Sequence, residues 1–133
     1  MIRSRVGVLT LMASGLVLTA QDNHEFETWM KSVGSSTGAI RKMEKKTGPE
    51  VVAGAEKISG VYENMIAYWR QRNADDAVKL SQDGKAAAVE LASAANAGDE
   101  AKATAAFAKV GGTSKPCHDA HREKNAEGKY IIK

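Results

Sequence analysis

The sequence predicts an all-α protein folded as an antiparallel up-down-up-down four-helix bundle. Apolar residues recur at alternating spacings of three and four along four segments, as on a helix face that packs in a bundle. Short turns rich in Gly, Pro, Asn and Asp separate these segments, and no run of alternating β-branched residues predicts a strand. At 133 residues, the chain has room for one domain.

Residues 1–20 have the pattern of a secretory signal peptide. Arg3 and Arg5 give a basic start, an uncharged apolar stretch follows, and Ala20 supplies a small residue at the cleavage position. Because the apolar stretch is too short for a stable membrane span, we expect export, cleavage and no membrane attachment afterwards. The mature domain is then residues 21–133. An uncleaved N-terminal helix that acts as an anchor is the alternative.

The first bundle helix is expected over about residues 23–46. Asp22 or Asn23 can cap its start, and Gly48-Pro49 ends it. Its apolar stripe consists of Phe26, Met30, Val33, Thr37 and Ile40.

The second helix is expected over residues 51–69, with Pro49 suited to its first turn. Its stripe consists of Val51, Ala55, Ile58, Tyr62, Met65 and Trp69. The third helix is expected over residues 74–97 with Asn73 as its N-cap, and small residues let it lie close to its partners. Its inward stripe consists of Ala77, Leu80, Gly84, Ala88, Leu91 and Ala95.

The fourth helix is expected from an N-cap at Asp99 to about Ala126. One broad face carries Ala103, Phe107, Val110, Ser114, Cys117, His118 and His121. Gly111, Gly112 and Pro116 lie inside this pattern, although each glycine costs a helix about 1 kcal/mol and a proline about 3 kcal/mol. Either the helix ends at Val110 and restarts at Pro116, or a bulky group lies against this backbone. We favour the second interpretation because Cys and His follow at once.

The charge pattern argues against nucleic acid as a partner. Loss of Arg3 and Arg5 with the signal peptide lowers the formal net charge from +3 to +1. Lysines alternate with acidic residues, and no basic stripe with interleaved aromatic side chains occurs. The single cysteine, Cys117, has no partner for an internal disulfide, so it is free, linked to another chain or attached to a ligand.

Cys117-His118 is the second half of the c-type haem attachment signature C-x-x-C-H. Ser114 stands where the first cysteine belongs, and its hydroxyl cannot form the second thioether. This pattern indicates haem c held by one thioether bond to Cys117 and one iron bond to His118. On these residues alone, a buried thiol beside a surface histidine is the alternative.

Two other chemistries use the same residues. Cys117, His118 and His121 form a possible zinc or copper site with His24, but zinc sites normally contain two spaced pairs of ligands. A nucleophilic Cys117 aided by His118 is disfavoured, because adjacent side chains on a helix point about 100° apart.

The last third of the chain resembles the final helix of the cytochrome c′ family, in GGTSKPCHDAHR and the preceding GDEAKATAAFAKV. FETWMKSVGSSTGAIRK and VYENMIAYWRQ resemble its first and second helices. The resemblance implies an antiparallel four-helix bundle with covalent haem c, a periplasmic location and a homodimer through the first two helices. It matches Cys117 to the second attachment cysteine, His118 to the proximal iron ligand and Arg122 to a basic residue beside the proximal face. Ser114 departs from the family pattern, and so does His121, which stands where an aromatic residue is usual.

The resemblance also implies that the first helix faces the other side of the haem. Members with a methionine there are low-spin electron carriers, and members without it bind nitric oxide or carbon monoxide at an open iron position. Met30 falls at this place, and we expect Trp29 against the porphyrin edge. The function expected is one-electron transfer to an unidentified redox partner protein, without enzymatic turnover. The alternatives are a five-coordinate gas-binding protein and a bundle that has lost haem and acts as a structural or interaction module.

Overall fold

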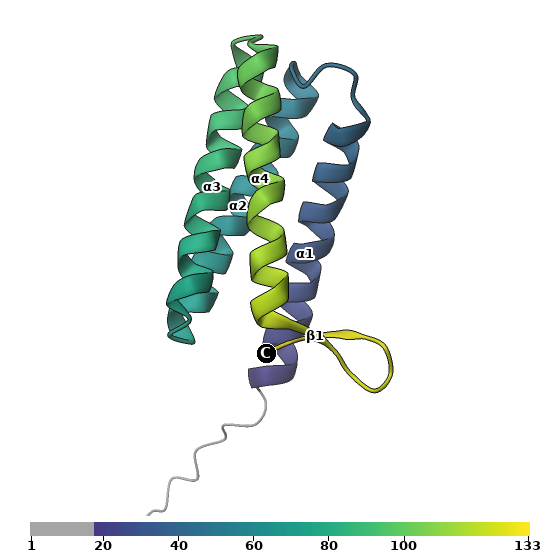
Figure 1. The fold of residues 1–133 in the computed structure, drawn as a ribbon, viewed down its shortest axis with the longest axis vertical. Coiled ribbons are helices and arrows are strands. Elements are labelled where there is room, and N and C mark those ends of the chain that lie inside the picture. Colours follow the sequence, from purple (N-terminus) through teal and green to yellow (C-terminus); the bar gives the residue numbers. More distant parts are fainter. Residues whose placement is uncertain (1–17) are drawn as a thin grey trace, which may run out of the picture.

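A computed structural model describes residues 18–133, and residues 1–17 of the expected signal peptide lie outside this range. Four helices, α1 (Leu18–Lys42), α2 (Pro49–Gln71), α3 (Asp75–Asn96) and α4 (Glu100–His121), run in alternating directions as neighbours in an elongated bundle (Figure 1). The predicted all-α four-helix bundle is confirmed. Within the described part of the chain, no helix is long and apolar enough to cross a membrane.

The predicted N-cap of the first helix is wrong. α1 begins at Leu18, so Asp22 and Asn23 lie inside the helix and do not open it. Leu, Ala and Gln upstream of them are good helix formers, which lets the helix extend in that direction. At the other end, the Lys46 ammonium donates to the carbonyl oxygens of Arg41 (3.3 Å) and Met43 (2.9 Å). These bonds satisfy carbonyls that the helix end leaves without partners.

The predicted cap of α3 is also wrong, whereas that of α4 is confirmed. Asn73 has a φ of 54° and belongs to the end of α2, where its N–H donates to the carbonyl of Arg70 at 3.1 Å. Asparagine tolerates this left-handed conformation better than most residues. Ala74 therefore precedes α3 without a side-chain cap. Asp99 Oδ1 accepts from the N–H of Lys102 at 3.1 Å, as expected of an N-cap.

The chain after α4 differs from the prediction of a helix to about Ala126 without strands. α4 ends at His121, and β1 (Arg122–Lys124) pairs antiparallel with β2 (Tyr130–Ile132). Asn125 Oδ1 accepts from the N–H groups of Glu127 and Lys129, both at 3.0 Å, and Gly128 has a φ of 76°. An asparagine side chain bonded to the following backbone and a left-handed glycine favour a turn over a helix.

The core lies mainly between α2, α3 and α4. All six stripe residues predicted for α2 are buried, and so are those of α3 except Leu80, which is half-buried. α1 packs against α2, α2 against α3 and α3 against α4, whereas α1 and α4 make no comparably close approach. The bundle is therefore open along the seam between its first and last helices.

An aromatic cluster joins the N-terminal half of α1 to α2. The Phe26 ring lies 4.8 Å from that of Tyr68 and 5.4 Å from that of Trp69, measured between centroids. The Trp29 ring lies 5.8 Å from Phe26 and 5.9 Å from Tyr68, in edge-to-face contacts. These contacts anchor α1 on α2 and leave its other face free for the seam.

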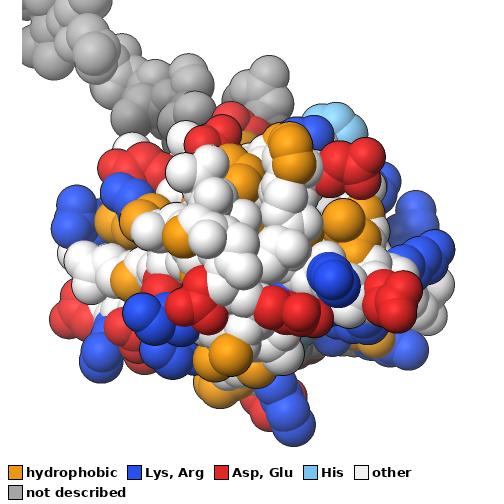
Figure 2. Space-filling view, turned by 90° about the horizontal axis from the view of Figure 1, so that it is seen from above, with side chains coloured by type: hydrophobic (Ala, Val, Ile, Leu, Met, Phe, Trp, Pro, Cys, Tyr) orange, Lys and Arg blue, Asp and Glu red, His pale blue; other side chains and the backbone are white. Residues whose placement is uncertain are grey.

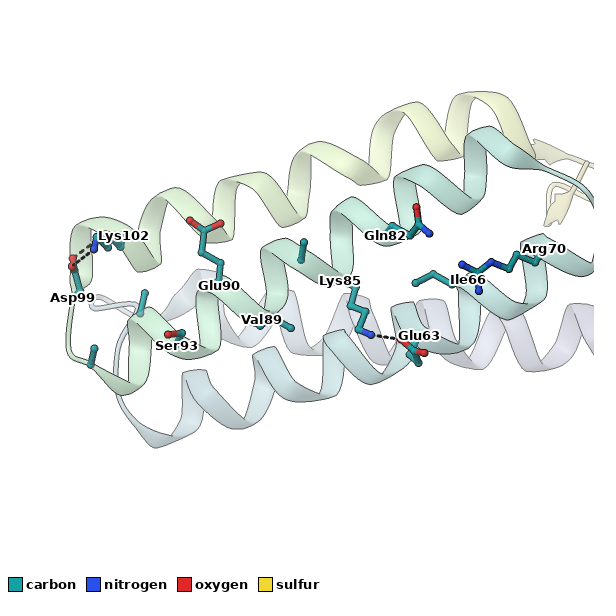
Figure 3. A pocket seen from close by; sticks show the side chains of 13 residues that line it. Glu63, Ile66, Arg70, Gln82, Lys85, Val89, Glu90, Ser93, Asp99 and Lys102 are labelled. Carbon is teal, nitrogen blue, oxygen red and sulfur yellow. Dashed lines mark hydrogen bonds and ion pairs between the residues drawn. The ribbon is translucent and has the colours of Figure 1, made fainter.

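The outer surface offers little that points to a ligand. Seen from above, acidic and basic side chains are interspersed over the end of the bundle (Figure 2). A shallow groove between α2 and α3 carries Val89, which is 52% exposed, and ion pairs such as Glu63–Lys85 (Figure 3). This groove contains none of the residues predicted to carry chemistry.

Candidate functional site

A cavity of about 1020 Å³ occupies the seam between α1 and α4. Its volume is at the upper end of the range of roughly 300–1,000 Å³ for ligand pockets. α1 contributes one wall with Met30, Val33, Gly34 and Thr37, and α2 contributes Tyr62, Met65 and Trp69. The α4 wall includes Phe107, Gly111, Ser114, Cys117, His118 and His121.

The structure brings together most of the residues that the sequence predicts for the site. Ser114, Cys117 and His118 line the cavity from α4, Arg122 from the start of β1, and Met30 from α1. Met30, Ser114, Cys117 and His118 are half-buried, so each is partly shielded from solvent. A thioether from α1 and an imidazole from α4 therefore share one cavity although they are far apart in sequence.

Trp29, which is expected against the porphyrin edge, lies on a different face of α1 from Met30. It is not among the residues that line the cavity, and its ring packs on Phe26 and Tyr68 in the aromatic cluster. Trp29 and Met30 are neighbours on a helix, and adjacent side chains point about 100° apart. With Met30 on the cavity side, Trp29 is directed toward α2.

α4 continues without interruption through Gly111, Gly112 and Pro116, so the alternative of a helix that ends at Val110 and restarts at Pro116 is wrong. A Cβ atom built on either glycine would meet no atom within 4 Å, and Gly111 lines the cavity. Among the described residues 18–133, no group therefore occupies the space next to these two glycines. That a bulky group does so remains a prediction, and the open space is consistent with it.

His118 is suited to ligate a metal as a neutral imidazole. Its burial, and secondarily the positive charge of Arg122, hold the pKa of the His118 ring below its usual value. Neither ring nitrogen has a hydrogen-bond partner within residues 18–133. The uncharged ring with an available lone pair is the form that binds iron.

Cys117 is protected from ionisation. Burial, with a smaller contribution from the negative charge of Asp76, raises the pKa of the Cys117 thiol. An activated nucleophile would need a lowered pKa, so the electrostatics disfavour the alternative of a nucleophilic cysteine.

His121 has a structural role in the described chain. Its Nε2 lies 2.7 Å from Asp76 Oδ2, its Nδ1 lies 3.2 Å from the carbonyl oxygen of Lys133, and its ring contacts Trp69 at 4.7 Å. The hydrogen bond from His121 lowers the pKa of the Asp76 carboxyl. Across the described residues, no three His, Cys, Asp or Glu side chains are grouped as a metal site requires. The zinc or copper alternative with His24 therefore has no support here.

Sequence reasoning missed the contribution of the C-terminal hairpin. Its cavity-lining residues are Asn125, Gly128, Lys129, Tyr130, Ile131 and Ile132. Three consecutive β-forming residues, Tyr130, Ile131 and Ile132, follow a turn that runs from Asn125 to Gly128, but three residues are too few to predict a strand.

The cavity fits a haem. Apolar side chains such as Val33, Met65 and Phe107 line it from three helices, and a sulfur and an imidazole project from α4. Trp69 lines the cavity, and its buried indole N–H has no acceptor in the described part of the chain. Because a buried donor normally has a partner, a ligand with acceptor groups at its edge suits this position.

Comparison with known proteins supports this assignment. Residues 62–122, from the second half of α2 through Arg122, match the family model described as Cytochrome C'. No curated protein and no solved structure gave a significant match. The matched range contains Ser114, Cys117 and His118, and the four-helix fold is that expected of the family. The family match and the four-helix fold together support the cytochrome c′ family, whose members bind haem c.

Proposed function

We propose that this protein is a one-electron carrier whose haem c is held by a single thioether at Cys117 and ligated axially by His118 and Met30. The observation that carries the proposal is that Met30 and His118 line one cavity from its two opposing helices. A bound haem supplies a redox couple that takes up and releases one electron.

The protein groups around the cavity favour such a role. The neutral His118 imidazole is a good donor to iron, and the Met30 thioether is soft and uncharged. An imidazole and thioether pair stabilises the reduced state and raises the reduction potential. Val33, Met65 and Phe107 supply apolar walls that reduce the access of water.

Export and assembly are part of the proposal. Residues 1–20 have the composition of a secretory signal, and the match to the cytochrome c′ family model supports a periplasmic location. We further propose that the mature chain begins at Gln21, exchanges electrons with a separate redox protein, and pairs with a second copy through α1 and α2.

Replacement of Met30 by alanine tests the distal ligand. The parent should give a low-spin ferrous spectrum that does not change on addition of carbon monoxide. Met30→Ala removes the thioether, so the spectrum should become high-spin and carbon monoxide should bind. Optical spectra of the reduced protein, with and without the gas, measure both changes.

Met65→Ala is the matched control, because Met65 is a second methionine that lines the cavity but lies on α2. It should remain low-spin while losing about 2–5 kcal/mol of stability from a buried site. A low-spin Met30→Ala would show that Met30 is not the ligand. A parent that binds carbon monoxide directly would identify the gas-binding alternative.

The glycines of α4 give an independent test of where the haem lies. Gly111→Leu places a side chain in the cavity wall, so haem incorporation should fall severalfold. Gly112→Leu, which does not line the cavity, should retain haem. Both changes should improve helix propensity by about 0.7–1 kcal/mol, so a difference in haem content cannot come from helix stability. Haem per protein, measured by absorbance and intact mass, is the readout; equal haem in both variants would contradict the placement.

A further inference from the structure

The C-terminal hairpin forms one wall of the cavity and is held together by several backbone hydrogen bonds. Besides its strand pairing, Asn125 binds Lys129 twice: its Oδ1 accepts from the Lys129 N–H at 3.0 Å, and its own N–H donates to the Lys129 carbonyl at 2.8 Å. Ile132 packs against the bundle core. Figure 1 shows the hairpin projecting beside the N-terminal part of α1, at the end of the seam.

His121 fastens this hairpin to the bundle. Its backbone carbonyl accepts from the N–H of Lys133 at 2.9 Å, while its ring contacts the carbonyl of the same residue and the Asp76 carboxylate. The end of the last strand is thus tied to α4 and, through Asp76, to α3. The position of the hairpin is therefore fixed by tertiary contacts as well as by its own turn.

The charged side chains that line the cavity are mostly positive. They are Arg41, Arg122, Lys129 and one carboxylate, Glu27. Glu27 already pairs with Lys31 at 3.1 Å, and the Arg122 guanidinium stacks on the Tyr130 ring at 3.9 Å. Lys129 has no ion pair within residues 18–133, although its charge reaches α1, where it adds to the effect of Lys31 in lowering the pKa of Glu27. The Lys129 ammonium is therefore available to pair with an anionic group in the cavity.

We propose that the hairpin is part of the haem-binding site, with Ile132 closing the apolar wall and the Lys129 ammonium pairing with a carboxylate of the haem. The proposal rests on haem binding in this cavity. Haem carries two carboxylates, and the excess positive charge of the lining matches them. Because Ser114 leaves only one thioether, contacts from the hairpin supply retention that a second covalent bond provides elsewhere.

Reversible binding in a Cys117→Ala background tests the proposal. Haem and its dimethyl ester, in which both carboxylates are blocked, are titrated and followed by Soret absorbance. Lys129→Ala should weaken haem binding by about threefold to tenfold, as expected for a partly exposed ion pair, and leave ester binding unchanged. Ile132→Ala should weaken the binding of both ligands by about tenfold, because it removes apolar contact.

Lys124→Ala is the matched control, since Lys124 lies in the same hairpin but does not line the cavity. It should change either dissociation constant by less than about twofold. Equal effects of Lys129→Ala and Lys124→Ala, or an equal effect of Lys129→Ala on haem and ester, would overturn the role of Lys129. A background protein that binds neither ligand would overturn haem binding itself, which distinguishes the two failures. Far-UV circular dichroism verifies that each variant is folded.

Discussion

Replacement of Cys117 by alanine should abolish covalent haem attachment completely. Cys117 is the single cysteine of the chain, so no other sulfur can form a thioether. The parent should gain the mass of one haem that survives denaturation and extraction with acid acetone. Cys117→Ala should have the mass of the polypeptide alone, and any haem bound to it should be extracted fully. Intact mass spectrometry of the purified protein measures this loss directly.

Two changes at Ser114 serve as controls. Ser114→Ala should retain the adduct, because the hydroxyl forms no bond to the porphyrin. Ser114→Cys restores the full C-x-x-C-H pattern and should saturate the second vinyl group. Addition of a thiol to a vinyl group conserves all atoms, so the mass gain stays one haem while the absorption maximum shifts. Denaturation-resistant haem on Cys117→Ala would refute the attachment site.

Introduction of a methyl group at Gly84 should strongly destabilise the bundle. A Cβ atom there would lie 2.6–2.9 Å from three ring atoms of Tyr62, and both residues are buried. The ring is also held at its tip, because the Thr113 hydroxyl donates to the Val110 carbonyl and the Tyr62 hydroxyl lies 3.1 Å from Thr113 Oγ1. We expect Gly84→Ala to lower the free energy of unfolding by about 1–3 kcal/mol, net of its gain in helix propensity. Urea denaturation measures the change.

Gly60→Ala should have the opposite effect on the free energy of unfolding. Gly60 is exposed on α2, and a Cβ atom there would meet nothing within 4 Å. This variant should gain about 0.5–1 kcal/mol, because only the helix propensity changes. Stabilisation by both substitutions would show that the contact between Gly84 and Tyr62 does not constrain the packing of α2 against α3.

The helices could be predicted because their information is local. The α2 stripe repeats at a single period over five turns, and all six of its residues are buried. The ends of the helices were harder to predict from the sequence, because neighbouring segments compete for the same residues. Asn73 has a side chain suited to open α3, but the termination of α2 places it in a left-handed conformation. Composition alone does not decide which helix uses such a residue.

For the candidate site too, residues in a local motif could be predicted and residues brought together by tertiary contacts could not. Cys117 and His118 are adjacent in a known signature, so the α4 wall could be predicted from one short stretch. Met30 required the family resemblance, because nothing in its own neighbourhood distinguishes a ligand from a core methionine. The contacts of the His121 ring could not be predicted from the sequence, because they join α4 to Asp76 of α3 and to Lys133, the last residue of the chain. Such contacts exist only after the helices have packed.

The wide separation of α1 from α4 links folding to cofactor loading. Without haem, α1 is stabilised by a single neighbouring helix, and the apolar groups facing the gap remain hydrated. An occupant would bury those groups on both sides and add a second packing surface for α1. The newly synthesised polypeptide should therefore be most susceptible to proteolysis and aggregation before it acquires haem, and early haem binding would protect it as well as activate it.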